Sequence, residues 1–431
     1  MNAPTLHILT FGCRVNQYES EAMLARLTYR VAADAKDADV VILNGCSVTG
    51  LAEKKARQAA RKIRRESPGV RILLTGCLAD AVEQGVARFD EADAIVGNAW
   101  KPYIEQVVSS LWDGTALQPS PPAPVSLDAE RTLGPAARVR AYLKVQDGCS
   151  GVCTYCHPTR LRGASRSKTL AAAVAEAAQL CASGFPELVL TGINLAEYAS
   201  PDGDLADLVG RLLVLPDLRR LRLASINPSG ITPRLLRVFE KDRRACRHFH
   251  IPLQSGSDTI LRRMARQTTR AQYLDRIDVI RRTLPDATFG TDIIVGFPGE
   301  TDTDFLETRG IVERVGFINL HAFRFSVRPG TAAQRLDGAV SGDVKRQRAD
   351  QLDECWKATL APLLDARVGK TEHVLTEACH DGHGYGYTSD YIHVTYTTSQ
   401  DVPIGKLRPV RITGRTAISL EGLDEHPTDT S

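Results

Sequence analysis

The chain has 431 residues, of which 43% are hydrophobic and 24% charged, a balance that excludes a disordered or fibrous protein. The net charge of +3 excludes a strongly basic protein that binds nucleic acid through charge alone. Residues 1–10 lack a basic start and a long apolar core, and the apolar runs are too short to cross a membrane. We therefore expect a cytoplasmic protein of two or three domains without a membrane span.

An N-terminal domain is expected over residues 1–112, where short apolar runs alternate with helical patterns. The expected strands are residues 7–10, 39–43, 71–75 and 94–96, and the expected helices are residues 18–27, 54–65 and 79–88. Short apolar strands that alternate with helices are typical of a parallel sheet. This region is therefore predicted to be an α/β domain with a parallel sheet.

A Pro- and Ala-rich stretch, residues 113–137, reads as a linker to a central domain over residues 138–365. The central domain repeats the alternation. Its expected strands are residues 141–145, 188–190, 221–224, 248–251, 288–295 and 318–325, with helices such as residues 170–181 and 273–282 between them. Six strand–helix units are too few for an eight-unit barrel, so an open, partial (β/α)6 barrel is predicted.

The composition changes again at about residue 366. Gly, Tyr, Thr and Val dominate residues 384–398, and residues 409–413 form another β-rich run, so residues 366–420 are predicted to be a small β-barrel. Residues 421–431 read as a polar tail. The tyrosines of this module could stack on bases or fill its core; they are Tyr385, Tyr387, Tyr391 and Tyr396.

A basic segment, residues 54–65, carries seven basic residues and no acidic one. Lys54, Arg57, Arg61 and Arg64 recur at helical spacing and would share one face. That face is either a solvated helix surface or a surface that contacts phosphate groups.

The strongest motif is a CxxxCxxC formed by Cys149, Cys153 and Cys156, directly after the first central strand. Three thiolates this close suit a four-iron four-sulfur cluster and leave one iron open to chelation by a substrate. The alternative is a zinc knuckle with His157 as fourth ligand. Adjacent residues rarely reach one tetrahedral ion together, so this alternative is the weaker one.

A second set of cysteines shares one context. Cys13, Cys46 and Cys77 each follow a glycine, each end a predicted strand and each precede a helix. The carboxyl ends of parallel strands meet at one edge of a sheet, so these three thiols are expected to converge there. The alternative is three buried apolar cysteines, which the threefold Gly-Cys repetition disfavours. A second open-iron cluster is the simplest use of this set.

These motifs resemble the radical-SAM (S-adenosylmethionine) methylthiotransferases over nearly the whole chain. The stretches that carry the resemblance are Gly12-Cys-Arg-Val-Asn-Gln-Tyr-Glu19, Asn44-Gly-Cys-Ser-Val-Thr49, Leu190-Thr-Gly-Ile-Asn194, His250-Ile-Pro-Leu-Gln-Ser-Gly256, Asp292-Ile-Ile-Val-Gly-Phe-Pro-Gly-Glu-Thr301 and Arg328-Pro-Gly-Thr331. The C-terminal module is similar to the family's TRAM domain, an RNA-binding barrel. The first stretch most resembles the branch that acts on threonylcarbamoyladenosine beside the tRNA anticodon.

The resemblance implies a tRNA-modifying enzyme with two [4Fe–4S] clusters. The cluster on Cys149, Cys153 and Cys156 would cleave SAM to a radical that takes hydrogen from carbon 2 of the adenine, and the other cluster would deliver methylated sulfur. Residues expected to border SAM at strand ends are Thr191, Gly192, Asn194, Ser225, Gln254, Ser255, Asp292, Gly296 and Glu300. The partners implied are the tRNA anticodon stem-loop and an electron donor such as flavodoxin or ferredoxin, with a monomer expected.

Three alternatives stay open at this point. The same chemistry could act on isopentenyladenosine in tRNA or on a ribosomal-protein aspartate, and a non-catalytic zinc-containing RNA-binding protein is the third. The sequence also departs from the family pattern at the segment from His157 to Arg160, at Gly45, and at Ala265 and Thr268. These departures concern pocket shape and substrate choice rather than the six cysteines.

Overall fold

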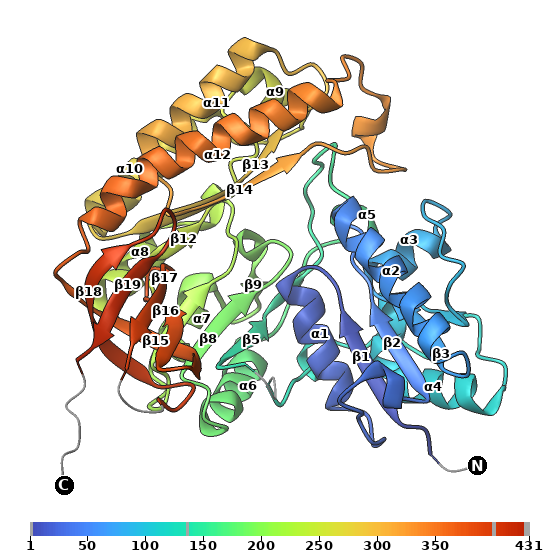
Figure 1. The fold of residues 1–431 in the computed structure, drawn as a ribbon. Coiled ribbons are helices and arrows are strands. Elements are labelled where there is room, and N and C mark those ends of the chain that lie inside the picture. Colours follow the sequence, from blue (N-terminus) through green and yellow to red (C-terminus); the bar gives the residue numbers. More distant parts are fainter. Residues whose placement is uncertain (1–2, 135–137, 399–401, 426–431) are drawn as a thin grey trace, which may run out of the picture.

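The computed structural model describes residues 3–134, 138–398 and 402–425. Figure 1 shows the N-terminal domain in blue, the central domain from green to orange, and the C-terminal barrel in red on the far side of the central domain. The three-part α/β architecture predicted from the sequence is confirmed.

The N-terminal sheet is fully parallel, with the strand order β1-β2-β3-β4. Its elements are β1 (Leu6–Thr10), α1 (Arg14–Leu24), β2 (Val40–Asn44), α2 (Gly50–Glu66), β3 (Arg71–Thr75), α3 (Cys77–Glu83), β4 (Ala94–Ile95) and α4 (Ile104–Asp113). Alternate residues of β2 enter two separate cores: Val41 and Leu43 face one side, and Val40 and Ile42 face the other. Both faces are covered, so every residue of β2 is buried.

The central domain contains six parallel strands that curve into an open barrel. They are β5 (Arg140–Lys144), β8 (Glu187–Thr191), β11 (Arg220–Leu223), β12 (His248–His250), β13 (Thr288–Val295) and β14 (Asn319–Arg324). The ladders β5-β8-β11 and β12-β13-β14 are joined by parallel bridges from Leu221 to Ala245 and from Ser225 to His250. The predicted partial (β/α)6 barrel is confirmed.

Helices and short strands connect these six strands. The helices are α5 (Pro158–Leu161), α6 (Leu170–Ala182), α7 (Leu205–Leu212), α8 (Pro233–Lys241), α9 (Asp258–Arg263), α10 (Arg270–Thr283), α11 (Asp302–Val315) and α12 (Gly342–Asp365). The short strands are β6 (Gln146–Asp147), β7 (Arg166–Ser167), β9 (Ala199–Ser200) and β10 (Gly203–Asp204). Long helices α10, α11 and α12 lie along the outside of the β13–β14 half (Figure 1).

The C-terminal module is a closed barrel in the order β15-β16-β17-β19-β18. Its strands are β15 (Thr371–His380), β16 (His383–Tyr387), β17 (His393–Thr397), β18 (Leu407–Arg415) and β19 (Leu420–Asp424). The prediction of a polar tail from residue 421 is therefore wrong for residues 421–424. The side of β19 that carries Leu420 and Gly422 is buried, which draws its polar residues into the ladder. Residues 426–431 lie outside the described part of the chain.

The Pro-rich linker packs against both domains that it joins. The short helical turn Leu127–Ala129 buries Leu127, and the carbonyl oxygen of Glu130 accepts hydrogen bonds from Tyr18 (2.7 Å) and Lys168 (2.5 Å). The stretch is predicted as a linker, and in the structure polar side chains from both domains satisfy the carbonyl oxygen of Glu130. Residues 135–137 lie outside the described part.

Most of the four tyrosines of the C-terminal barrel are engaged in contacts within the protein and do not offer a free ring face for stacking on bases. Tyr396 is buried and shares a 2.7 Å hydrogen bond with Thr376. Tyr391 stacks on His248 of the central domain, with ring centroids 5.6 Å apart, and Tyr387 stacks on Tyr391 at 5.0 Å. These contacts fasten the barrel to the central domain, so the three rings serve packing.

Within the described residues, no helix is both long and apolar enough to span a membrane.

Candidate active site

Three strand ends of the N-terminal sheet bring Cys13, Cys46 and Cys77 to one edge. A Cβ atom on Gly12 would lie 2.2 Å from the Cβ of Cys46, so the first two loops touch. A Cβ atom on Gly76 would lie 2.6 Å from the carbonyl oxygen of Gly45, so the second and third loops touch. The expected convergence of the three Gly-Cys loops is therefore what the fold produces.

The thiols of this set lie close enough to shift one another's pKa. Burial, together with the nearby thiols of Cys13 and Cys77, raises the pKa of Cys46 to about 12. Burial also raises the pKa of Cys77, while Arg162 opposes that shift. A bound metal reverses such shifts, because its positive charge favours the thiolate. Three clustered thiols are thus a soft donor set that suits iron and sulfide.

The CxxxCxxC loop follows β6 at the carboxyl end of the first barrel strand. The sulfur of Cys149 accepts hydrogen bonds from the backbone N–H of Gly151 (3.3 Å) and from the amide of Asn194 (3.6 Å). Burial and the neighbouring thiols raise the pKa of Cys156 to about 11. N–H groups directed at a cysteine sulfur are typical of iron–sulfur ligation, so this loop also fits a cluster.

The zinc alternative required His157 beside the same three cysteines. The ring Nε2 of His157 instead lies 2.7 Å from the carbonyl oxygen of Pro329. Arg160 likewise donates to the carbonyl oxygen of Gly330 at 2.7 Å. The unusual segment after Cys156 therefore docks on the loop at residues 328–331.

That loop also reaches the second cysteine set. The guanidinium of Arg328 donates to the carbonyl oxygen of Ser47 at 2.6 Å and lies 3.4 Å from Glu53. Ser47 directly follows Cys46. One loop thus touches the neighbours of both cysteine sets.

Several residues predicted to border SAM lie at the carboxyl ends of barrel strands. Thr191 ends β8, and a Cβ atom on Gly192 would lie 2.7 Å from the side-chain oxygen of Gln146. Asn194 donates to the sulfur of Cys149, and its side-chain oxygen accepts a 2.9 Å hydrogen bond from the amide of Asn227. This group therefore lies beside the CxxxCxxC loop.

A second group lines the neighbouring strands. Asp292 of β13 lies 3.3 Å from His250 and 3.0 Å from His321, and Ser225 shares a 2.9 Å hydrogen bond with His250. Burial raises the pKa of Asp292, but the hydrogen bonds from the two histidines outweigh it and hold that pKa well below its usual range. Gln254 adopts φ +70°, a conformation that a non-glycine residue keeps only where its surroundings fix it.

Three predicted residues are held by helices. Ser255 lies 3.4 Å from Thr308 of α11, and Glu300 accepts a 2.7 Å hydrogen bond from Arg348 of α12. Glu300 also accepts the backbone N–H of Gly296 at 3.0 Å. A Cβ atom on Gly296 would meet Lys345 of α12 at 2.3 Å. These contacts fix the strand ends against α11 and α12.

The chain matches two family models, the radical SAM superfamily over residues 143–310 and the uncharacterized protein family UPF0004 over residues 5–97. It is 38% identical to the threonylcarbamoyladenosine tRNA methylthiotransferase MtaB of Thermotoga maritima, over 95% of this chain and 94% of that protein. It belongs to the radical-SAM tRNA methylthiotransferases. The methylthiotransferase is accordingly a SAM-dependent transferase that carries [4Fe–4S] clusters.

Two further proteins are similar to this methylthiotransferase. The tRNA-2-methylthio-N(6)-dimethylallyladenosine synthase of Dictyoglomus thermophilum is 33% identical over 97% of this chain and 98% of that protein. Among solved structures, the radical SAM methyltransferase TsrM of Kitasatospora setae matches with a TM-score of 0.54 and 13% identity, over 74% of this chain and 72% of that chain. That likeness concerns the fold.

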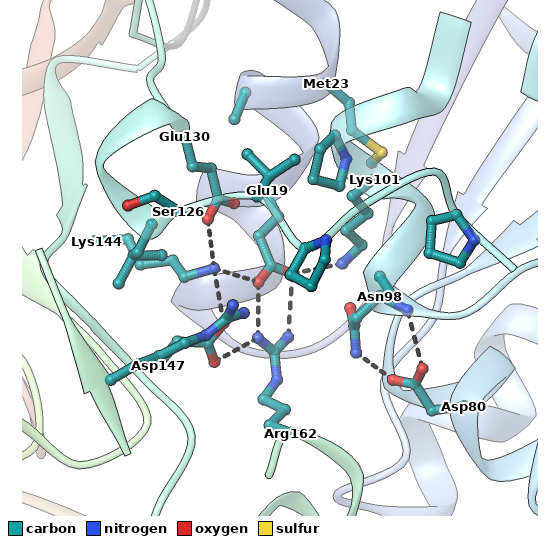
Figure 2. Close-up of a pocket in the computed structure, with 18 of the residues that line it drawn as sticks. Glu19, Met23, Asp80, Asn98, Lys101, Ser126, Glu130, Lys144, Asp147 and Arg162 are labelled. Atoms are coloured by element: carbon teal, nitrogen blue, oxygen red, sulfur yellow. Dashed lines mark hydrogen bonds and ion pairs between the residues drawn. The ribbon is translucent and has the colours of Figure 1, made fainter. Parts of the chain in front are cut away.

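The methylthiotransferase also contains a buried charged network that sequence reasoning missed. It lies between the two cysteine sets, and Figure 2 shows its residues Glu19, Lys101, Glu130, Lys144, Asp147 and Arg162 at a cavity of about 530 Å³. Its members are Asn16, Glu19, Lys101, Glu130, Lys144, Asp147 and Arg162. Asn16 and Glu19 are buried in α1 together with apolar residues such as Val15 and Met23, a placement that their polar side chains do not reveal in the sequence.

Most of the basic face at residues 54–65 forms ion pairs with acidic residues of the same domain. Arg57 and Arg61 pair with Glu91 at 3.5 and 2.9 Å, and Arg64 pairs with Asp93 at 2.8 Å. The face predicted to be either solvated or phosphate-binding is thus mainly an intramolecular ion-pair surface on α2.

Proposed function

We propose that this enzyme methylthiolates carbon 2 of N6-threonylcarbamoyladenosine next to the anticodon of tRNA. The proposal rests on two observations. Three Gly-Cys loops converge at one edge of the N-terminal sheet, and Arg162, six residues after Cys156, lies 3.1 Å from the sulfur of Cys77 in a chain 38% identical to a relative named for that substrate. The relative named for dimethylallyladenosine is 33% identical, which favours the threonylcarbamoyl branch.

In this proposal each cysteine set holds one [4Fe–4S] cluster. With SAM bound, the cluster on Cys149, Cys153 and Cys156 supplies the radical chemistry that removes hydrogen from an unreactive carbon. Asn194 and the N–H of Gly151 orient Cys149 through their hydrogen bonds to its sulfur. Cys13, Cys46 and Cys77 hold the cluster that takes part in sulfur transfer.

The residues proposed to border SAM fall into two roles. Thr191, Gly192 and Asn194 end or follow β8 next to the CxxxCxxC loop, while Ser225 and Asp292 share the contacts of His250 and His321 and Gln254 follows β12. Ser255, Gly296 and Glu300 keep β13 and the loop after β12 in place through α11 and α12. This division explains why both groups occur in the family's motifs.

The RNA partner is an anticodon stem-loop, from which the modified base must be splayed out to reach the clusters. A ring pair on the C-terminal barrel supports such a contact: half-buried Tyr385 stacks on exposed His380, with ring centroids 4.6 Å apart. We further infer that the enzyme works as a monomer in the cytoplasm and takes electrons from a flavodoxin- or ferredoxin-like donor.

Nucleoside mass spectrometry of tRNA from a deletion strain tests the substrate. The proposal predicts that 2-methylthio-N6-threonylcarbamoyladenosine disappears, that its unmethylthiolated precursor accumulates, and that the intact gene restores it. Loss of the 2-methylthio-isopentenyl nucleoside instead, or loss of aspartate methylthiolation in a ribosomal protein, would assign the chain to another branch.

A further inference from the structure

Arg162 occupies the centre of the network that joins the two cysteine sets. It follows Cys156 by six residues, directly after α5, and its side chain is 2% exposed. Its Nε lies 3.1 Å from the sulfur of Cys77, which belongs to the other domain. A cation from the CxxxCxxC loop thus contacts a ligand of the second set.

All five N–H groups of this guanidinium have an acceptor. One terminal nitrogen donates to Glu19 (2.6 Å) and Asp147 (3.0 Å), and the other donates to Asn16 (2.9 Å) and Glu19 (3.0 Å). The fifth N–H, on Nε, points at the sulfur of Cys77. A guanidinium donates from five positions in a fixed plane, so four bonds to oxygen determine the direction of the fifth. The network therefore fixes the direction of the bond to sulfur, and Figure 2 shows the bonds of Arg162 to Glu19 and Asp147.

The oxygen acceptors are themselves fixed. Glu19 is 2% exposed and also pairs with Lys101 and with Lys144, the latter at 2.7 Å. Burial raises the pKa of Glu19, but attraction to Arg162, Lys101 and Lys144 outweighs it and holds the pKa well below its usual range. Glu19 is thus a permanent carboxylate, and Arg162 has a rigid anchor.

The donor that reaches the sulfur of Cys77 differs in kind from the donors that reach Cys46 and Cys149. Cys149 receives neutral N–H groups from Gly151 and Asn194. Cys46 receives the backbone N–H of Val48 at 3.4 Å. Cys77 receives a charged donor, which is about twice as strong as a neutral one. Hydrogen bonds and positive charge at cluster sulfurs stabilise the reduced, more negative state of a cluster.

We propose that Arg162 is a positioning residue for the second cluster, which it serves by fixing the sulfur of Cys77 and raising the cluster's reduction potential. This inference rests on the proposed assignment of that cluster to Cys13, Cys46 and Cys77. A residue next to the ligands of the first cluster would thereby set the reduction potential of the second cluster.

The test uses the full chain with Cys149, Cys153 and Cys156 changed to Ala, so that only the second cluster is present. Arg162→Gln removes the charge and the N–H to sulfur, and Arg162→Lys keeps the charge without the planar donor. Arg166→Gln is the matched control. Arg166 also pairs with Asp147 (3.1 Å), yet its side chain is 55% exposed.

Each protein is first assayed for iron and sulfide, and about four irons per chain are expected in all. Its midpoint potential is then measured by redox titration followed with electron paramagnetic resonance. We expect Arg162→Gln to lower the potential by at least about 59 mV, a tenfold change for one electron. Arg162→Lys should lower it less, and Arg166→Gln should match the parent.

Unchanged potentials in both Arg162 variants would overturn the proposal. Loss of iron in those variants alone would also overturn it, because Arg162 would then serve cluster retention rather than potential. A parent protein without iron would overturn the cysteine assignment itself, and this inference with it. The iron assay thus separates failure of the proposed function from failure of the role of Arg162.

Discussion

The backbone of Gly12 packs directly against Cys46: a Cβ atom on Gly12 would lie 2.2 Å from the Cβ of Cys46 and 2.6 Å from its sulfur. Gly12 also has φ +100°, a conformation that side-chain-bearing residues rarely adopt. The glycine before Cys13 is therefore required both for its backbone conformation and for the space that it leaves to the neighbouring ligand.

Replacing Gly12 by Ala should dismantle the second cysteine set. The left-handed conformation alone costs about 1–3 kcal/mol for a non-glycine residue, and the clash with Cys46 adds to it. We expect iron to fall from about eight to about four atoms per chain after reconstitution, while the first cluster remains. Gly69→Ala is the control, since nothing lies within 4 Å of its added Cβ. Eight irons in Gly12→Ala would contradict this account.

Glu187 of β8 anchors a buried ion pair in the barrel wall. It lies 2.9 Å from Arg222 and 3.8 Å from Arg220, and both partners are buried. Removal of one partner of a buried pair typically costs about 3–5 kcal/mol. Glu187→Gln should therefore lower the thermal unfolding midpoint clearly, whereas Asp353→Asn, at an exposed pair with Lys357, should change it little. Equal midpoints for the two variants would contradict the structural role of Glu187.

The buried pair of Glu187 and Arg222 also predicts how the stability of the protein depends on pH. Burial raises the pKa of Glu187, but attraction to Arg222 and Arg140 outweighs it and leaves the pKa below its ordinary value. The stabilisation is then complete above the unfolded-state pKa of about 4.3 and is lost as pH falls through the lower folded-state value. The difference in unfolding midpoint between the natural chain and Glu187→Gln should stay constant from pH 7 to 5 and narrow below pH 4. A difference that already narrows above pH 5 would show that Glu187 is not held ionised.

Asp292 offers a test of the proposed SAM site. Its carboxylate holds both His250 and His321, so Asp292→Ala leaves two imidazoles without their shared partner. Because the proposed site places Asp292 beside SAM, we expect the loss of this half-buried carboxylate to cost about 1–3 kcal/mol of SAM binding, a roughly 5- to 150-fold weaker affinity. The SAM affinity of each variant is measured by equilibrium binding to the reconstituted protein. Asp278→Ala, which removes an exposed partner of Arg314, is the control.

An unchanged SAM affinity in Asp292→Ala, together with weaker tRNA binding, would move the His250–Asp292–His321 group from the cofactor side to the RNA side of the site.

The cysteine sets could be predicted from the sequence because each lies where local signals are strong. The three Gly-Cys pairs mark strand ends, and parallel strands carry their ends to a common edge whatever the details of packing. The positions of the six barrel strands followed from short apolar runs for the same reason. The strand content of residues 421–424 was missed, because four residues with two acids resemble a tail until the barrel partner is known.

Side-chain direction could not be predicted in the same way. Ser255 and Glu300 lie in the loops that follow β12 and β13, and α11 and α12 supply their partners, because a position after a strand does not determine where a side chain points. Arg162 was missed for another reason. Its partners Glu19 and Cys77 are 143 and 85 residues away, so only the docking of two domains brings them together.

The two cysteine sets carry out different steps in the proposed reaction, and a pair of triple variants separates those steps. Both are assayed anaerobically with SAM, a reductant and tRNA that contains threonylcarbamoyladenosine. With Cys13, Cys46 and Cys77 changed to Ala, the protein should still release 5′-deoxyadenosine but form no methylthio nucleoside. With Cys149, Cys153 and Cys156 changed, it should release neither. Methylthio nucleoside from the first variant, or 5′-deoxyadenosine from the second, would contradict the account.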